Sequence, residues 1–235
     1  MVVFSIIYTF YLYFLVVSSF FLGISIVIFL SLFFQNKERL FQSAAHLWAK
    51  FLILLSGIKV SVHGLENIPR QQPVIFAANH QSAADIPILL AYLPVNFRFA
   101  IKKELFYIPI FGWYLRKAGY FSIDREAILS AYKTLTDIIE IIKLGGSVLI
   151  FPEGTRSYDG NLGKFKKGSL MAALKAQAPL IPIAISGSYH IMPRKTWLIR
   201  PYPVKLSIGK PIYIKTREEY ENKVEEVRRV IAKML

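Results

Sequence analysis

The stretch PVIFAANHQSAADIPILLAYL, residues 73–93, joins a predicted strand to a predicted helix through a short polar connection. Its first part, PVIFAAN, is apolar and is bounded by proline and asparagine, which is typical of a strand in the interior of a sheet. Its last part, DIPILLAYL, is predicted to be helical, and Pro87 is acceptable in the first turn of a helix. A strand followed directly by a helix is the repeating unit of α/β folds.

The same alternation continues on both sides of this stretch. Segments rich in β-branched or aromatic residues predict further strands at 58–64, 97–102, 120–124, 147–154, 180–186 and 204–214. Further helices are predicted at 125–145, 167–178 and 217–235. The sequence therefore predicts one α/β domain at 57–235, with a central mixed, largely parallel sheet flanked by helices.

The first 36 residues contain no Asp, Glu, Lys or Arg and consist mostly of Phe, Ile, Leu, Val and Tyr. As one helix, the segment through Phe34 would be about 51 Å long, whereas the hydrocarbon layer of a bilayer is about 30 Å thick. It could cross a membrane with tilt or bend into a shallow hairpin near Gly23. A secretory signal peptide is the competing interpretation, but the segment lacks a basic start and its apolar run is far longer than that of a signal peptide. We expect a membrane anchor.

Residues 37–56, KERLFQSAAHLWAKFLILLS, mix charged residues with Leu, Phe and Trp at roughly helical spacing. This pattern predicts an amphipathic helix that ends near Gly57 and completes an anchor region at 1–56. The first basic residues after the apolar run are Lys37 and Arg39. By the positive-inside tendency, they are expected to keep the rest of the chain at the cytoplasmic face of the cell membrane.

The chain has a net charge of +14, and the charge is unevenly distributed. Between Gly160 and Arg217 there are eleven Lys and Arg residues and no acidic residue. Such a surface attracts the phosphate groups of nucleic acids or of anionic lipids, and the predicted anchor favours lipids over nucleic acid. A surface that serves only solubility is the alternative. The chain has no cysteine, which excludes disulfides and thiolate chemistry.

Polar clusters follow three of the predicted strands. The first cluster contains His80 and Asp85, the second Asp124 and Arg125, and the third Glu153, Gly154, Thr155 and Arg156. Ligand sites in open α/β sheets lie beyond the carboxyl ends of the strands. We therefore expect the three clusters to meet in one crevice.

His80 is the predicted general base, because histidine as a residue type is neutral near neutral pH yet can take a proton from an alcohol. Asp85 could hold one ring nitrogen and stabilise the cation that forms. Residues five apart on one helix point about 140° away from each other, so the connection must turn between them. Asp85 also has structural explanations, since Ser82 to Asp85 matches a capping box and Asp85 itself could cap the next helix. Neither explains His80.

Two other chemistries fit less well. A nucleophilic Ser82 would need to face His80, which near neighbours on a turning backbone seldom do, and the chain has no Gly-x-Ser-x-Gly motif. The four histidines are scattered without the spacing of metal ligands, so no metal site is predicted. Direct attack by a substrate hydroxyl is simpler.

In FPEGTRS, Arg156 can bind a phosphate monoester through two N–H groups, and Gly154 permits close approach of the backbone.

Four blocks together resemble the 1-acylglycerol-3-phosphate (lysophosphatidic acid) acyltransferases of the glycerolipid acyltransferase superfamily. They are NHQSAAD at 79–85, GYFSIDR at 119–125, FPEGTRS at 151–157 and LIPIAI at 180–185, in family order. The resemblance implies transfer of a fatty acyl group from a thioester to the free hydroxyl of lysophosphatidic acid, at the sn-2 position, giving phosphatidic acid. The block with Asp before Arg is more similar to acyltransferases whose acceptor already carries one acyl chain.

The resemblance also implies roles for single residues. His80 and Asp85 would be the catalytic pair, and Pro182 and its apolar neighbours would border the acyl chain. Binding of the glycerophosphate would fall to Lys102, Lys103, Arg125, Glu153, Gly154, Thr155 and Arg156. The donor would be acyl-CoA or acyl carrier protein as co-substrate, with no cofactor. The expected partners are membrane lipids and not nucleic acid.

Two alternatives stay open from the sequence. A related acyltransferase could use glycerol-3-phosphate, another lysophospholipid or another lipid as acceptor, because the first and third blocks are shared across the wider superfamily. A non-enzymatic protein that binds membrane surfaces or nucleic acid would explain the charge and the anchor. It would leave His80, Asp85 and FPEGTRS unexplained.

Overall fold

The computed structural model describes residues 2–123 and 128–235. Its centre is a seven-stranded sheet in the order β1-β7-β6-β2-β5-β3-β4. The strands are β1 (Val60–His63), β2 (Ile75–Ala78), β3 (Phe97–Lys102), β4 (Phe121–Ile123), β5 (Ser147–Ile150), β6 (Leu180–Ser186) and β7 (Val204–Ile208). Only β6 and β7 pair in antiparallel fashion among these strands. The predicted mixed, largely parallel sheet is confirmed.

The middle strand β2 is buried on both faces, as its uninterrupted apolar sequence predicts. Successive side chains of a strand point to opposite faces. Phe76 and Ala78 accordingly belong to one hydrophobic core, and Ile75 and Ala77 to a second core on the other face. The sheet is therefore the middle layer of a three-layer α/β sandwich.

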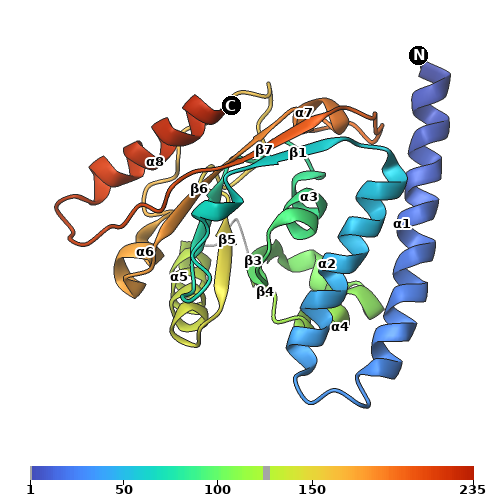
Figure 1. The fold of residues 1–235 in the computed structure, drawn as a ribbon, viewed down its shortest axis with the longest axis horizontal. Coiled ribbons are helices and arrows are strands. Elements are labelled where there is room, and N and C mark those ends of the chain that lie inside the picture. Colours follow the sequence, from blue (N-terminus) through green and yellow to red (C-terminus); the bar gives the residue numbers. More distant parts are fainter. Residues whose placement is uncertain (1, 124–127) are drawn as a thin grey trace.

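Helices cover the two faces as separate groups (Figure 1). The first core contains residues of α1 (Val2–Leu30), α2 (Lys37–Ser56), α3 (Asp85–Tyr92) and α4 (Pro109–Lys117). The second core contains residues of α5 (Ile128–Lys143), α6 (Met171–Ala176) and α8 (Tyr220–Met234). The short α7 (Ser188–Ile191) and two 3-10 turns, Leu65–Asn67 and Lys103–Tyr107, complete the described elements.

The apolar N-terminal segment is one helix that continues through Gly23, and the chain turns back only after Leu30. Helix α2 then runs back beside α1, as Figure 1 shows. The hydroxyl of Tyr8 donates to the carbonyl of Ser56 at 2.7 Å, and the indole of Trp48 donates to Ser19 at 3.0 Å. These bonds join the start of α1 to the end of α2, and the middle of α1 to the middle of α2.

The prediction for 37–56 agrees with α2 at both ends. Asn36 caps the first turn by accepting a hydrogen bond from the main-chain nitrogen of Arg39. Gly57 ends the helix with a φ of 69°, a left-handed conformation that glycine adopts without a steric penalty. The buried face of α2, which includes Phe41 and Ala49, packs in the same core as strand residues. The division of the chain at residues 56 and 57 stays a prediction.

Helix α4 was not predicted from the sequence. Its segment, PIFGWYLRK, begins with proline and contains a glycine and three aromatic residues, so its helical signal is weak. The backbone is also non-helical at Ile110. Tertiary contacts stabilise it instead: Tyr114 packs against Phe41 and donates a hydrogen bond to its carbonyl at 2.7 Å.

Candidate active site

Residues 79–84 form the connection between β2 and α3 without regular helix or strand, as the sequence required. Asn79 fixes the start of this connection to the neighbouring strand β6. Its side chain donates to the carbonyl of Ile185 at 3.0 Å and accepts from the nitrogen of the same residue at 2.7 Å. The next residue, His80, therefore leaves the carboxyl end of the sheet in a defined direction.

His80 and Asp85 are brought into contact by this turn. Nδ1 of His80 lies 2.7 Å from Oδ2 of Asp85, whose side chain is fully buried. The same carboxylate oxygen accepts hydrogen bonds from the main-chain nitrogens of Gln81 and Ser82, at 2.8 and 2.9 Å. With Nδ1 engaged by Asp85, Nε2 is the ring nitrogen left to meet a substrate.

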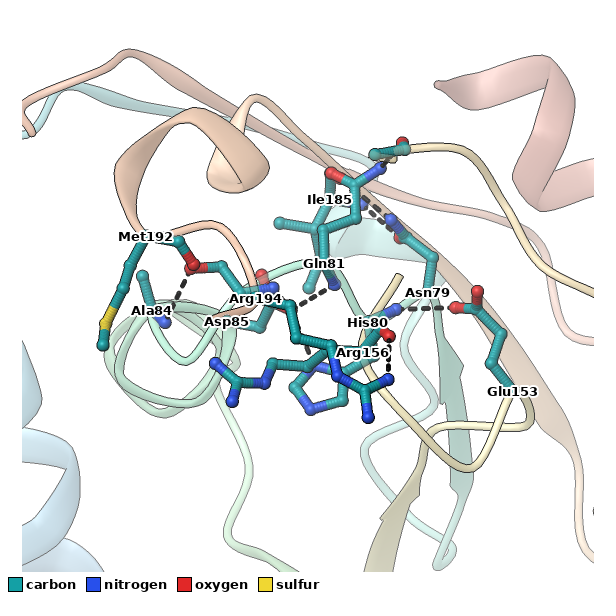
Figure 2. A network of polar contacts seen from close by, with 12 residues as sticks. Asn79, His80, Gln81, Ala84, Asp85, Glu153, Arg156, Ile185, Met192 and Arg194 are labelled. Atoms are coloured by element: carbon teal, nitrogen blue, oxygen red, sulfur yellow. Dashed lines mark hydrogen bonds and ion pairs between the residues drawn. The ribbon is translucent and has the colours of Figure 1, made fainter. Parts of the chain in front are cut away.

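The capping box predicted at Ser82–Asp85 is present in part, whereas Asp85 is the first residue of α3 and not its cap, a position that Ala84 occupies. The hydroxyl of Ser82 accepts from the nitrogen of Ala84 at 3.2 Å, while the Ser82 nitrogen donates to Asp85. The hydroxyl of Ser82 also donates to the carbonyl of Met192 at 3.1 Å (Figure 2). Asp85 thus both organises the start of α3 and orients His80, so the two explanations of Asp85 do not exclude each other.

The FPEGTRS segment follows β5 and holds His80 from the other side. The ring of Phe151 stacks on the imidazole with 4.0 Å between centroids. Glu153 is buried, and its two oxygens accept from the main-chain nitrogens of His80 at 2.8 Å and of Gly163 at 2.7 Å. Burial raises the pKa of Glu153, and the two N–H groups partly offset that effect.

Arg194 lies at the candidate site, although no motif in the sequence pointed to it. Its guanidinium donates to the hydroxyl of Thr155 at 2.8 Å and to the carbonyl of Arg156 at 3.1 Å, and it lies 4.0 Å above the ring of Tyr158. Figure 2 shows Arg194 and Arg156 with His80 in one polar network. In the sequence, Arg194 is only one of the eleven Lys and Arg residues between Gly160 and Arg217, so nothing selects it from the other ten.

The remaining predicted residues lie at different distances from this network. Gly154 and Thr155 belong to the FPEGTRS turn, and Gly154 has a φ of 71°. Lys102 is exposed at the end of β3 and pairs with Glu104 at 3.1 Å, and Lys103 begins the turn that follows. Pro182 is buried in β6, where it is paired in register with Ala77. Arg125, and with it the end of the GYFSIDR block, lies outside the described residues.

Two cavities share the wall residue Phe99, and His80 lines the smaller one. His80, Phe151 and Gly154 line a cavity of 100 Å³, together with Phe99 at its far side. Phe99 also lines an almost entirely apolar cavity of 240 Å³ between α1, α2 and α3. Gly23, Ile24 and Ala45 are among the residues around this second cavity. The large cavity beneath the N-terminal helices and the cavity at His80 thus have the Phe99 side chain in common as a wall.

The fold and the site define an α/β protein with a histidine–carboxylate pair at the carboxyl edge of a parallel sheet, beside an arginine pair and an apolar cavity. Such a pair can take a proton from a hydroxyl group, and such arginines can bind an anion. Within residues 2–123 and 128–235, no three His, Asp or Glu side chains are grouped as metal ligands.

Comparison with known proteins names the family. The family model described as Acyltransferase matches residues 59–186. The crystal structure of a 1-acyl-sn-glycerophosphate acyltransferase from Thermotoga maritima superimposes with a TM-score of 0.85 at 33% identity, covering 98% of this chain and 96% of that one. The chain belongs to the Acyltransferase family.

Curated relatives agree with this assignment. A chloroplastic 1-acyl-sn-glycerol-3-phosphate acyltransferase of Brassica napus is 37% identical over 187 residues, which are 79% of this chain and 54% of the relative. A protein of the same name from Pseudomonas aeruginosa is 36% identical over 167 residues, 69% of this chain and 64% of the relative. The chain thus spans about half to two thirds of the length of these relatives.

Proposed function

We propose that the protein transfers a fatty acyl group from a thioester to the free sn-2 hydroxyl of 1-acylglycerol-3-phosphate and so forms phosphatidic acid for phospholipid biosynthesis. The observation that carries the proposal is the His80–Asp85 contact, because it leaves Nε2 available at a cavity whose described lining contains no Ser, Cys or Lys side chain. The names of the relatives support the choice of acceptor.

In the proposed reaction, Nε2 of His80 takes the proton as the acceptor hydroxyl attacks the thioester carbonyl. Asp85 stabilises the imidazolium that forms. When the tetrahedral intermediate collapses, the carbon–sulfur bond breaks, and the proton passes from His80 to the leaving thiolate. The hydroxyl of Ser82 is occupied by Met192 and Ala84, which supports direct transfer without an acyl-enzyme.

Arg156 and Arg194 are the proposed ligands of the acceptor phosphate. Both are half-buried, and a guanidinium binds a phosphate monoester through two parallel N–H groups. Arg194 is fixed by Thr155 and by stacking on Tyr158, so little side-chain entropy remains to be lost when the phosphate binds. We still predict that positive charge around the acceptor phosphate also comes from Lys102, Lys103 and Arg125.

Glu153 is proposed to position His80 and not to contact the phosphate. Both of its oxygens are already bonded to main-chain N–H groups, and a carboxylate would repel the anion. The proposed acyl-chain site is the apolar cavity that begins at Phe99. Pro182 does not line either of the two cavities described above, so a role in the sheet fits it better than acyl contact.

Membrane association is indicated by α1, which is long and apolar enough to cross a bilayer. We propose that α1 lies in one leaflet at the cytoplasmic face of the cell membrane. Its inner face is packed on α2 and on the domain from Thr9 to Val27, and its outer face exposes large side chains such as Phe14 and Phe29. This packing along the domain supports a helix that lies in one leaflet over one that crosses the bilayer.

The test is a transfer assay with detergent-purified protein. It is given lysophosphatidic acid with acyl-CoA or acyl carrier protein as donor, and the lipid products are analysed by mass spectrometry. Glycerol-3-phosphate and another lysophospholipid serve as competing acceptors. Formation of phosphatidic acid supports the proposal, whereas acylation of another acceptor in preference would contradict it.

A further inference from the structure

A groove with two lysines at its rim runs from the active-site turn along the opposite face of the sheet from α1 and α2. It has a volume of 240 Å³ and lies between α5, the Phe151–Gly154 turn and the segment Lys166–Ser169. We call it the lysine groove. It shares Phe151 and Gly154 with the cavity that contains His80. A bound molecule can therefore reach the histidine from this side.

We propose that the lysine groove binds the phosphopantetheine arm of the acyl donor, the portion that coenzyme A and acyl carrier protein have in common. This inference rests on the proposed acyl transfer and adds the donor's binding site to it. The acceptor phosphate would lie at Arg156 and Arg194, and the donor would arrive from the other side of His80.

The groove matches the arm in charge. Lys166 and Lys167 line its rim, and the lining residues that the structure describes include no carboxylate. The arm carries a phosphate at the end far from the sulfur, and Lys166 and Lys167 are the cations in the described lining that can bind this anion. The hydrocarbon part of the Lys166 side chain lies over Gly154, where a Cβ atom would approach Lys166 Cε to 2.6 Å.

The groove also matches the arm in polarity. Its walls are mainly apolar, with Leu135 and Ile138 of α5 on one side and Ala172 of α6 on the other. The hydroxyl oxygen of Ser169 is buried and has no hydrogen-bond partner among residues 2–123 and 128–235. A buried hydroxyl without a partner is costly, and an amide of the arm would supply one.

The test measures binding of two unreactive donor analogues, a long-chain alkyl thioether of coenzyme A and the same thioether of pantetheine, which lacks the phosphate. Lys166→Gln with Lys167→Gln is expected to weaken the coenzyme A analogue about tenfold and to leave the pantetheine analogue unchanged. Lys175→Gln, an exposed lysine of α6 outside the groove, is the matched control. Equal binding of the coenzyme A analogue to wild type and double variant would overturn the proposal.

A second pair of variants tests the groove itself. Leu135→Trp would fill it, because Leu135 lines the groove and not the cavity that contains His80, and should weaken both analogues, whereas Thr136→Trp, at the next position and exposed, should weaken neither. The same thioether attached to acyl carrier protein distinguishes the two natural carriers. Of the coenzyme A analogue and the acyl carrier protein analogue, the one that binds wild-type protein more tightly corresponds to the natural donor. A raised Michaelis constant for lysophosphatidic acid in the lysine variant, with donor binding intact, would instead assign the groove to the acceptor. Because analogue binding needs no turnover, a protein that binds the donor but makes no phosphatidic acid would overturn only the proposed function.

Discussion

Nδ1 of His80 lies 2.7 Å from Oδ2 of Asp85, although the two residues are separated by a turn and Asp85 begins a helix. The same oxygen holds the main-chain nitrogens of Gln81 and Ser82. The aspartate therefore fixes both the shape of the turn and the orientation of the imidazole. A change at Asp85 alters the local backbone as well as the catalytic pair.

His80→Ala should lower turnover by a factor of about 10² to 10⁴, because the proposed general base is lost. Asp85→Asn should cause a comparable loss, since an amide cannot stabilise the imidazolium as a carboxylate does. Circular dichroism of both purified variants is expected to stay close to wild type, and thermal unfolding should change little in His80→Ala but fall in Asp85→Asn, whose buried side chain holds the turn. Near-normal turnover by folded His80→Ala protein would refute the mechanism.

Ser82→Ala should retain activity within about a factor of three, because the hydroxyl has no role in direct transfer. The variant loses hydrogen bonds to Met192 and Ala84, which should lower the free energy of unfolding by about 1 kcal/mol. Steady-state transfer rates and chemical unfolding check the two parts separately. Complete loss of activity in the folded variant would point to an acyl-serine intermediate.

Arg156→Ala and Arg194→Gln should each raise the Michaelis constant for lysophosphatidic acid by about tenfold while the constant for the donor stays the same. Arg200→Gln is a suitable control, because Arg200 is an exposed arginine of the same loop as Arg194. Initial rates at varied acceptor and donor concentrations measure both constants. An unchanged acceptor constant would remove that arginine from the phosphate site.

Glu153→Gln should change the pH dependence of stability. The pKa of Glu153 is raised in the folded state by burial, so its contribution to stability is greatest below its unfolded pKa and is lost as pH rises through its folded pKa. The wild type should therefore gain thermal stability relative to Glu153→Gln as pH falls from neutrality toward about 5. Glu221→Gln, at an exposed position of α8, should show no such trend. If the difference in melting temperature between wild type and Glu153→Gln is the same at every pH, the raised pKa of Glu153 in the folded state is contradicted.

Gly23→Leu should shift the acyl chains that are transferred toward shorter ones. Gly23 lines the apolar cavity and has no heavy atom within 4 Å of where its Cβ would lie, so a leucine can be accommodated and occupy cavity space. Ser25→Leu, on the exposed side of the same helix, should leave the preference unchanged. Competition between short and long acyl donors, with products separated by mass, measures the effect. The same chain preference in both variants would place the acyl chain elsewhere.

The local pattern of the chain determined much of the fold. Apolar runs with abrupt polar ends predicted the strands, and the helical spacing of residues 37–56 with a stop at Gly57 predicted α2, because both features depend on residues close together in sequence. The need for a turn between His80 and Asp85 followed from helix geometry alone. Helix α4 and its contact with Phe41 could not be predicted, since its stability comes from packing with a distant segment.

Only the tertiary structure brought Arg194 to Thr155, a pair 39 residues apart, and placed the buried Glu153 carboxylate under the main chain of His80. Sequence singled out His80, Asp85 and FPEGTRS, which the structure brings together, because their spacing is local and their residue types carry chemistry. It could not select Arg194 among similar cations or find the lysine groove, because a cavity and a cation's partners exist only where separate elements pack together.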